Sequence, residues 1–148
     1  MNPTVIICVG NRFVPNDDLG CRVFDHLASA SLPAGTVLVD GGLCGLDLLR
    51  VIEGKRRVVF ADALTGMAST GEVVVLDRLE VATYAASYGH GAGLPYLLRL
   101  LPQVCPAPMP EIVLVGAQVR GDPNLPAADE LTVRAVAARC LEVAEHGT

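Results

Sequence analysis

Three segments of the sequence carry side chains of the types that bind divalent metal ions. The adjacent acids Asp17 and Asp18 follow the first apolar run, Asp62 closes the apolar run Val58–Ala61, and His90 stands among glycines. A carboxylate at the end of such a run needs a cation, a metal or strong hydrogen bonds to remain ionised. Two carboxylates and one imidazole form a mixed oxygen and nitrogen ligand set, which suits Zn²⁺ or Ni²⁺ better than Ca²⁺. The pattern predicts a divalent-metal site with open positions.

Each of these residues also has a simpler interpretation. Asn16, Asp17 or Asp18 would cap the helix that follows, because side-chain oxygens accept hydrogen bonds from the free amides of a first turn and the helix dipole favours negative charge. Capping by one acid leaves the other acid without a role. His90, taken alone, is typical of a solvent-exposed loop. The metal-site hypothesis therefore depends on the three segments meeting in space.

The rest of the chain alternates short β-branched apolar runs with longer helical patterns, which is typical of α/β units around a largely parallel sheet. The run Val5–Val9 is continuously apolar, so we expect helices on both faces of the sheet. Ligands of such sheets bind beyond the carboxyl ends of the parallel strands, where the strand order reverses. The expected strands are Thr4–Val9, Thr36–Val39, Arg57–Ala61, Glu72–Leu76 and Glu111–Gly116.

Apolar residues at helical spacing predict the helices. Such residues recur over Leu19–Leu27, Leu46–Ile52 and Leu94–Leu101, and the last helix is expected at about Ala127–Ala144. The stretch Pro102–Pro110 is expected to be a stiff connection into the last strand, because proline cannot continue a helix.

The composition favours a single domain over residues 1–148. Hydrophobic residues make up 51% of the chain, charged residues 18%, and the formal net charge is −5, whereas a disordered chain is rich in charge and poor in apolar residues. The acidic balance and the 4% aromatic content disfavour nucleic acid as a partner. No apolar stretch has the length of a membrane span, and the N-terminus lacks the features of a signal peptide. Five cysteines without a C-x-x-C pair are typical of buried thiols in a reducing cytoplasm.

The sequence lacks the motifs of several other common kinds of functional site. The sequence has no G-x-G-x-x-G, no G-x-x-x-x-G-K-[ST] and no G-x-S-x-G, which disfavours dinucleotide binding, a P-loop and a serine nucleophile. Cys21 lies near a helix start, where a thiol can be activated, although a buried inert thiol is the commoner case. A receiver-type phosphoacceptor domain would need a lysine after its last strand, and Lys55 precedes the third strand.

The order and spacing of these motifs resemble those of the hydrogenase maturation endopeptidases, which trim the C-terminus of the large subunit of [NiFe]-hydrogenase precursors. The resemblance covers nearly the whole chain. It rests on Val9-Gly10-Asn11 followed by Asp17 and Gly20, on Asp40-Gly41-Gly42, on the strand ending at Asp62, on His90 with Gly93-Leu94 and Leu97-Leu98, and on Val115-Gly116-Ala117-Gln118.

The resemblance implies a fold, a site and an activity. The fold would be a three-layer α/β/α sandwich on a five-stranded, mostly parallel mixed sheet, with Glu72–Leu76 as the antiparallel strand. Asp17, Asp62 and His90 would be the metal ligands and catalytic residues of a metal-dependent endopeptidase in the cytoplasm. The hydrogenase large-subunit precursor would be its partner and would supply Ni²⁺, with Zn²⁺ or another divalent ion able to substitute.

The sequence departs from the usual pattern of this family at four positions. They are Asn16, Asp18, Leu43 and Gly91, where the family usually has an acid, a glycine, a threonine and an acid. Counting from Asn11 places the metal ligand at Asp17, and Asp18 is the alternative ligand. A non-catalytic metal-binding or chaperone module on the same fold is the alternative function.

Overall fold

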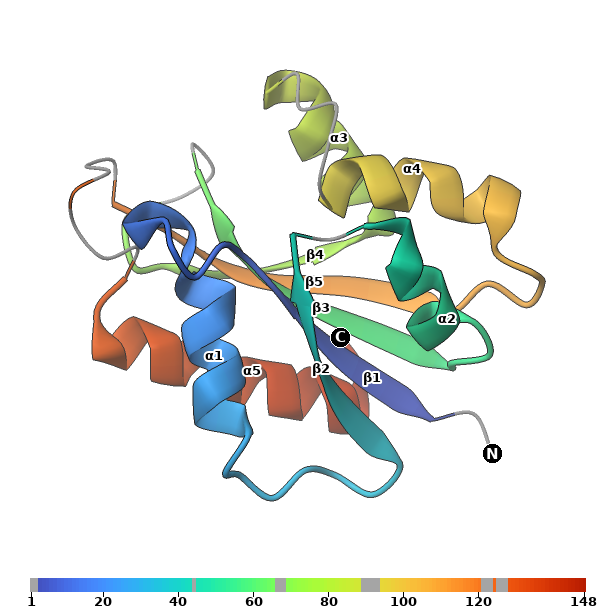
Figure 1. Ribbon diagram of the computed structural model, residues 1–148, viewed down its shortest axis with the longest axis horizontal. Coiled ribbons are helices and arrows are strands. Elements are labelled where there is room, and N and C mark those ends of the chain that lie inside the picture. Colours follow the sequence, from blue (N-terminus) through green and yellow to red (C-terminus); the bar gives the residue numbers. More distant parts are fainter. Residues whose placement is uncertain (1–2, 44, 66–68, 89–93, 121–123, 125–127) are drawn as a thin grey trace.

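Five strands form the centre of the computed structural model, which describes residues 3–43, 45–65, 69–88, 94–120, 124 and 128–148. The strands are β1 (Thr4–Val9), β2 (Thr36–Gly42), β3 (Arg57–Leu64), β4 (Val73–Asp77) and β5 (Glu111–Gln118). They form one sheet in the order β2-β1-β3-β5-β4 (Figure 1). Four strands are parallel, and β4 pairs with β5 in the antiparallel direction. This arrangement confirms the predicted mixed sheet.

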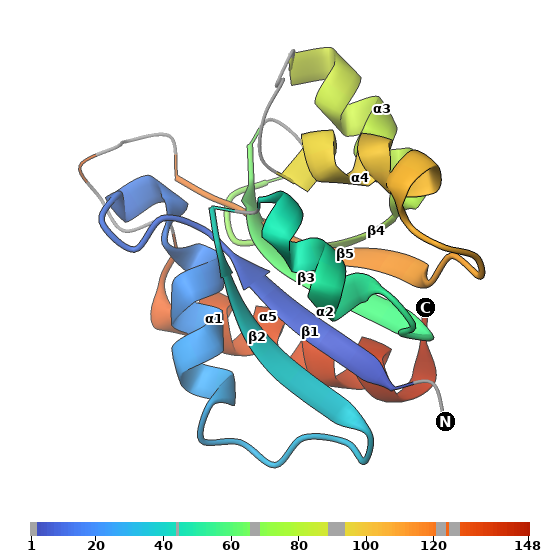
Figure 2. The same ribbon diagram turned by 45° about the vertical axis from the view of Figure 1, so that its right-hand side comes forward.

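Helices cover both faces of this sheet (Figures 1 and 2). On one face lie α1 (Leu19–Leu27) and α5 (Glu130–His146), and on the other lie α2 (Leu49–Ile52), α3 (Arg78–Tyr88) and α4 (Leu94–Val104). The 3-10 turns η1 (Pro15–Asp17) and η2 (Leu46–Leu48) precede α1 and α2. The three layers confirm the predicted α/β/α sandwich. Among the described residues, no helix is long and apolar enough to span a membrane.

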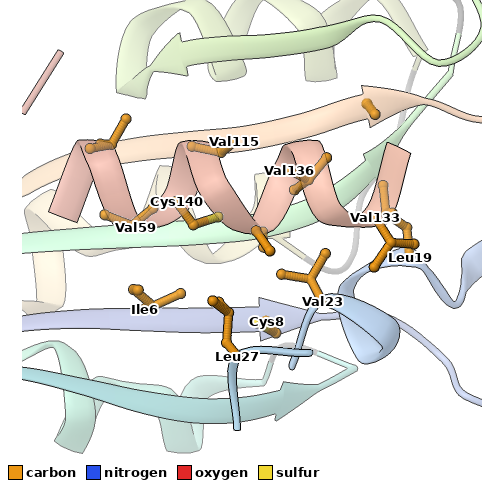
Figure 3. Packing of buried hydrophobic residues seen from close by; sticks show 14 of the residues in the cluster. Ile6, Cys8, Leu19, Val23, Leu27, Val59, Val115, Val133, Val136 and Cys140 are labelled. Atoms are coloured by element: carbon orange, nitrogen blue, oxygen red, sulfur yellow. The ribbon is translucent and has the colours of Figure 1, made fainter. Parts of the chain in front are cut away.

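The side chains of β1 belong to two separate halves of the core. Ile6 and Cys8 are buried under α1 and α5, whereas Val5, Ile7 and Val9 are buried on the face of the other three helices. Successive strand side chains point to opposite faces, so a strand buried on both faces has a continuously apolar sequence. Figure 3 shows the first half of the core, which contains Ile6, Cys8, Leu19, Val23, Leu27, Val59, Val115, Val133, Val136 and Cys140.

β3 is longer than predicted, and its extra length changes the position of Asp62. The pairing of β3 with β1 ends at Ala61, but its pairing with β5 continues through Leu64. Asp62 pairs with Gly116 and therefore lies inside the strand, not after its end. Hydrogen bonds to a neighbouring strand keep the backbone extended whatever the polarity of the side chain, so the end of the apolar run does not mark the end of the strand.

The sequence analysis does not predict α3, because its apolar residues lack a regular helical spacing. Val81 is buried, whereas Leu79 is 69% exposed. Local hydrogen bonds fix the start of this helix instead. The amide of Glu80 donates to the carboxylate of Asp77 at 2.8 Å, and the amide of Asp77 donates to the carboxylate of Glu80 at 3.1 Å. This reciprocal pair is a capping box with Asp at the first position.

The end of α4 also differs from the prediction. The helix passes through Pro102 and ends at Val104, where the sequence predicts a connecting segment from Pro102 onward. Proline removes one helical hydrogen bond, but the neighbouring Leu101 is fully buried. Burial of Leu101 in the core therefore outweighs the local preference of proline at this end of the helix.

Specific polar contacts fix both ends of α5. The carboxylate of Asp129 accepts from the amide and from the hydroxyl of Thr132, both at 2.8 Å, and these bonds lower the pKa of Asp129. At the other end, the buried guanidinium of Arg57 donates to the carbonyl of Ala144 at 3.0 Å. A positive charge there stabilises the helix dipole. The helix thus starts at Glu130, slightly later than predicted.

The first turn of α1 lies against the carboxyl end of β1 and against β3 at Ala61, the last residue of β3 that pairs with β1. A Cβ atom at Gly20 would be 1.9 Å from the carbonyl oxygen of Val9 and 2.9 Å from that of Ala61. Both neighbours are backbone atoms, which cannot rotate away as a side chain does. Gly20 therefore allows α1 to begin directly over the end of β1 and over β3 at Ala61.

We expect Gly20→Ala to lower the free energy of unfolding by about 3 kcal/mol, because the added methyl group overpacks a backbone contact. Gly35→Ala is the matched control: its φ is +75°, but a Cβ there meets no atom within 4 Å. The left-handed conformation alone should cost about 1 kcal/mol. Urea denaturation measures both values, and equal losses for the two variants would contradict the close contact at Gly20.

Candidate functional site

The strand order reverses at β1, and the candidate site lies at this point. From β1 the chain moves to β2 on one side, and then returns to β3 on the other side. The segments that follow β1 and β3 therefore leave the carboxyl edge of the sheet next to each other, which is where α/β folds bind ligands. Asp17 comes from the first of these segments, and Asp62 lies on β3, one residue beyond its last pair with β1.

Backbone hydrogen bonds fold the segment after β1 into a closed turn that places Asp17. The amide of Asn11 donates to the carbonyl of Asp17 at 2.9 Å, and the amide of Asp17 donates to the carbonyl of Val14 at 2.9 Å. The side chain of Asn11 accepts from the amide of Phe13 at 2.9 Å. A Cβ at Gly10 would be 2.5 Å from the carbonyl oxygen of Asp17. The motif residues Gly10 and Asn11 are thus required by the shape of the turn.

Arg12 connects this turn to its two neighbours. Its guanidinium donates to both carboxylate oxygens of Asp25 on α1, at 2.7 and 3.1 Å. On the other side it lies 4.0 Å from the carboxylate of Asp40 on β2, and the same carboxylate accepts from the amide of Gly42 at 3.1 Å. The sequence analysis missed this role of Arg12, because residues far apart in sequence supply its partners.

Asp62 has the most perturbed acidity at this edge of the sheet. It shares a strand face with Phe60 and Leu64, which belong to the core half under α2, α3 and α4. Burial and the negative charge of Asp17 raise its pKa to about 8, although its carboxylate accepts from the amide of Ala63 at 2.8 Å. Burial also raises the pKa of Asp17. The two predicted acids are therefore close enough to interact, and the charge of Asp17 disfavours the ionised form of Asp62.

The structure contradicts a capping role for Asp18 and leaves one oxygen of its carboxylate without a hydrogen-bond partner among the described residues. Asp18 occupies the position before α1, but its side chain makes no capping hydrogen bond. Its Oδ1 is buried and has no hydrogen-bond partner in the described part of the chain. Its charge raises the pKa of Asp17. Asp17 itself lies in η1, one residue earlier.

His90, the third predicted ligand, lies outside the described residues, between the last residue of α3 and the first residue of α4. Over the described ranges, no three His, Cys, Asp or Glu side chains form a group that would hold a metal ion. The other two histidines, His26 and His146, are exposed, as expected for surface residues. Of the predicted trio, the structure thus shows Asp17 and Asp62 as neighbours.

A close approach between β5 and β3 explains why glycine stands at position 116. Gly116 on β5 pairs with Asp62, and a Cβ at Gly116 would be 2.5 Å from the carbonyl oxygen of Asp62. A side chain at this position would therefore push β5 away from the strand that carries the acid.

An open hollow of about 600 Å³ lies where β2 ends. The sequence does not predict this hollow, because its shape depends on how the chain turns after β2. Its lining residues are Asp40, Gly41, Gly42, Leu43, Gly45 and Asp47.

The cysteines offer no activated nucleophile among the described residues. Cys21 is buried near the start of α1, and burial raises the pKa of its thiol. Burial also raises the pKa of Cys8, and it raises that of Cys140 to about 12. These thiols stay protonated at neutral pH, as expected for inert core cysteines.

The fold and the site define an α/β/α protein with two coupled carboxylates at the switch point of its sheet. A family model described as hydrogenase maturation protease matches residues 21–144. The chain belongs to the hydrogenase maturation protease family, which confirms the predicted family.

Solved structures with similar names share this fold. An endopeptidase from Escherichia coli is 25% identical, covers 95% of this chain and 88% of its own, and has a TM-score of 0.74. The endopeptidase HycI from the same organism is 22% identical, with coverages of 98% and 93% and a TM-score of 0.75. The E. coli hydrogenase maturating endopeptidase HybD is 21% identical, with coverages of 95% and 88% and a TM-score of 0.70. A search of curated proteins found no match.

The pKa of Asp62 predicts a pH-dependent stability of the metal-free protein. In the unfolded chain Asp62 loses its proton near pH 4, whereas in the folded chain it keeps the proton up to about pH 8. The folded state thus binds more protons in this range, and the free energy of unfolding falls as the pH rises from 4 to 8.

Asp62→Asn removes this titration. We expect the variant to gain stability over the wild type as the pH rises, reaching about 1–2 kcal/mol at pH 8 for a partly exposed carboxylate. Urea denaturation at pH 4.5, 6 and 8 measures the difference. A difference that is constant across this range would contradict the raised pKa.

Proposed function

We propose that this protein is a metal-dependent endopeptidase that removes the C-terminal extension of a [NiFe]-hydrogenase large-subunit precursor. The observation that carries the proposal is the placement of Asp17 and Asp62 side by side at the switch point. A buried carboxylate whose pKa is raised by the charge of a neighbouring carboxylate is stabilised in its ionised form by a cation bound to both. Membership of the maturation protease family supports the reaction class.

In this proposal the metal is nickel that the precursor already carries, and Asp17, Asp62 and His90 bind it. Zn²⁺ or another divalent ion is expected to substitute as a ligand of the same site. Nickel bound there supplies a Lewis acid that polarises the scissile carbonyl or lowers the pKa of a water molecule. A carboxylate of Asp17 or Asp62 accepts the proton of the attacking water. The protonated state of Cys21 agrees with a mechanism without a covalent nucleophile.

The cytoplasm is the location that we propose for this reaction. The described cysteines, Cys8, Cys21, Cys105 and Cys140, are all free thiols, as is usual in a reducing compartment.

Incubation with nickel-loaded and nickel-free precursor tests the proposal. We expect cleavage of the nickel-loaded precursor alone, and a loss of at least about 100-fold in rate for His90→Ala, because general acid–base and metal contacts each contribute on that scale. Mass spectrometry of the precursor measures the product. Cleavage that is independent of nickel, or equal rates for the wild type and His90→Ala, would overturn the proposed mechanism.

A pair of adjacent variants identifies the acidic ligand. The charge of Asp17 acts on Asp62, whereas that of Asp18 acts on Asp17. We therefore expect Asp17→Asn to abolish cleavage and to weaken Ni²⁺ binding in calorimetry by at least about tenfold, with Asp18→Asn as the matched control at near wild-type affinity. The reverse ranking would assign the ligand role to Asp18.

A non-catalytic metal-binding or chaperone module is the second candidate. The buried Oδ1 of Asp18, which has no hydrogen-bond partner within the described ranges, favours it, because this carboxylate stands where the resemblance implies a glycine. Binding of the nickel-loaded precursor without a change in its mass would support the module. Cleavage that appears only in the variants Asp18→Gly or Gly91→Asp would show that these departures had removed an ancestral activity.

A further inference from the structure

The side chain of Arg12 attaches the turn between β1 and α1 to two other elements. Its guanidinium donates to the carboxylate of Asp25 on α1, and it lies 4.0 Å from the carboxylate of Asp40 on β2. Figure 2 shows that the connection after β1 and the end of β2 lie at the same edge of the sheet. The turn that contains Asp17 is thus connected through one side chain to a helix and to a strand.

The contact between Arg12 and Asp25 restricts orientation as well as distance. Two hydrogen bonds, of 2.7 and 3.1 Å, run from the two terminal nitrogens of the guanidinium to the two oxygens of one carboxylate. Paired bonds of this kind add geometric specificity, because both planar groups must lie in matching directions. The guanidinium of Arg12 is therefore held in one orientation against α1.

A second connection closes a ring beside Arg12. The carboxylate of Asp40 accepts from the amide of Gly42 at 3.1 Å, and the carbonyl of Gly42 accepts from the amide of Gly10 at 2.9 Å. Gly10 lies two residues before Arg12, so the ring returns to the base of the turn. The turn is therefore attached to β2 both through its backbone and through Arg12.

The backbone transmits the constraint from Arg12 to Asp17. The amide of Asn11, the residue before Arg12, donates to the carbonyl of Asp17 at 2.9 Å. A Cβ at Gly10 would be 2.5 Å from the same carbonyl oxygen. The two residues that precede Arg12 thus pack against the backbone of Asp17, and a change in the orientation of the turn at Arg12 would move the carboxylate of Asp17 as well.

The ion pairs of Arg12 are too exposed to contribute much to the stability of the fold. The side chains of Arg12, Asp25 and Asp40 are 47%, 55% and 47% exposed, and solvent and salt screen charges at such positions. A metal ligand, in contrast, must lie within about 0.2 Å of its ideal distance. A contact that stabilises one orientation of the turn over similar ones can therefore matter for metal binding and not for folding.

We propose that Arg12 is a positioning residue of the metal site, an inference that rests on the proposed function. By joining the turn to Asp25 and Asp40, Arg12 holds the carboxylate of Asp17 where it and that of Asp62 bind the same nickel ion. Arg12 acts through Asp17 and contacts neither the metal nor the scissile bond. Replacement of residues that orient a metal ligand lowers metal affinity by about 10- to 100-fold.

The test compares Arg12→Gln with the matched control Arg139→Gln in the full-length protein. Arg139 is also exposed and also pairs with an acid, Glu142, but both of these residues lie on α5. We expect Arg12→Gln to weaken Ni²⁺ binding in calorimetry, and to lower kcat/KM for the nickel-loaded precursor, by about tenfold each. Its midpoint of urea denaturation should equal that of the wild type. Arg139→Gln should match the wild type in all three measurements.

A variant of the partner shows whether Arg12 acts through its ion pair. Asp25→Asn should reproduce both losses of Arg12→Gln, and the double variant should lose no more than either single variant, because each change removes the same contact. Wild-type affinity and kcat/KM in Asp25→Asn would mean that Arg12 acts without this contact, and would overturn the inference.

Hydrogen exchange gives a measurement that needs neither nickel nor the precursor. The amides of Asn11 and Asp17 close the turn, and we expect them to exchange about tenfold faster in Arg12→Gln, because the turn opens locally more often. Exchange at the wild-type rate would overturn the role of Arg12 and leave the endopeptidase intact. Faster exchange with a wild-type kcat/KM would also overturn it.

The inference and the proposed function fail in different ways. If the wild type binds Ni²⁺ without cleaving the precursor, and Arg12→Gln weakens that binding, Arg12 keeps its role and the endopeptidase fails. Absence of both nickel binding and cleavage in the wild type would overturn both.

Discussion

The contact between Gly20 and the carbonyl oxygens of Val9 and Ala61 is the constraint on which the site depends. It places the start of α1 directly over the carboxyl end of β1 and over the last residue of β3 that pairs with β1. The chain then has only a short path from β1 to α1, and hydrogen bonds from Asn11 close that path into a turn. Asp17 is consequently close enough to Asp62 on β3 for its charge to raise the pKa of that residue. A larger residue at position 20 would separate these elements and with them the two acids.

The same arrangement works against the stability of the metal-free protein. Burial raises the pKa of both acids, the charge of Asp17 raises that of Asp62 further, and the charge of Asp18 raises that of Asp17. The amides of Ala63 and Asn11 oppose these shifts. The core compensates, since both faces of the sheet are covered by apolar side chains from five helices. A protein can keep an unfavourable pair of charges at a binding site when the fold around it is stable without them. The high apolar content of the sequence is thus part of the reason that the acids can stand together.

Particular elements show how far sequence reasoning reached. The bounds of β1 follow from its apolar run, and α1 follows from the spacing of Leu19, Val23 and Leu27, because burial dictates both patterns. Sequence reasoning failed for α3, whose start depends on two local side-chain bonds, and for the end of β3, which depends on hydrogen bonds to β5. It also failed for the proposed capping of α1, because Asp18 has a capping position without a capping bond.

The sequence by itself determined the family, the alternation of strands and helices, and the two acids and one histidine predicted to bind metal. Residue types and their order along the chain are sufficient for these conclusions, because backbone and burial preferences are local. Only the tertiary structure decided that Asp17 lies close enough to Asp62 to raise its pKa, and that Arg12 joins α1 to β2. Distances between residues far apart in sequence depend on how strands pair and helices pack, and no local pattern contains them.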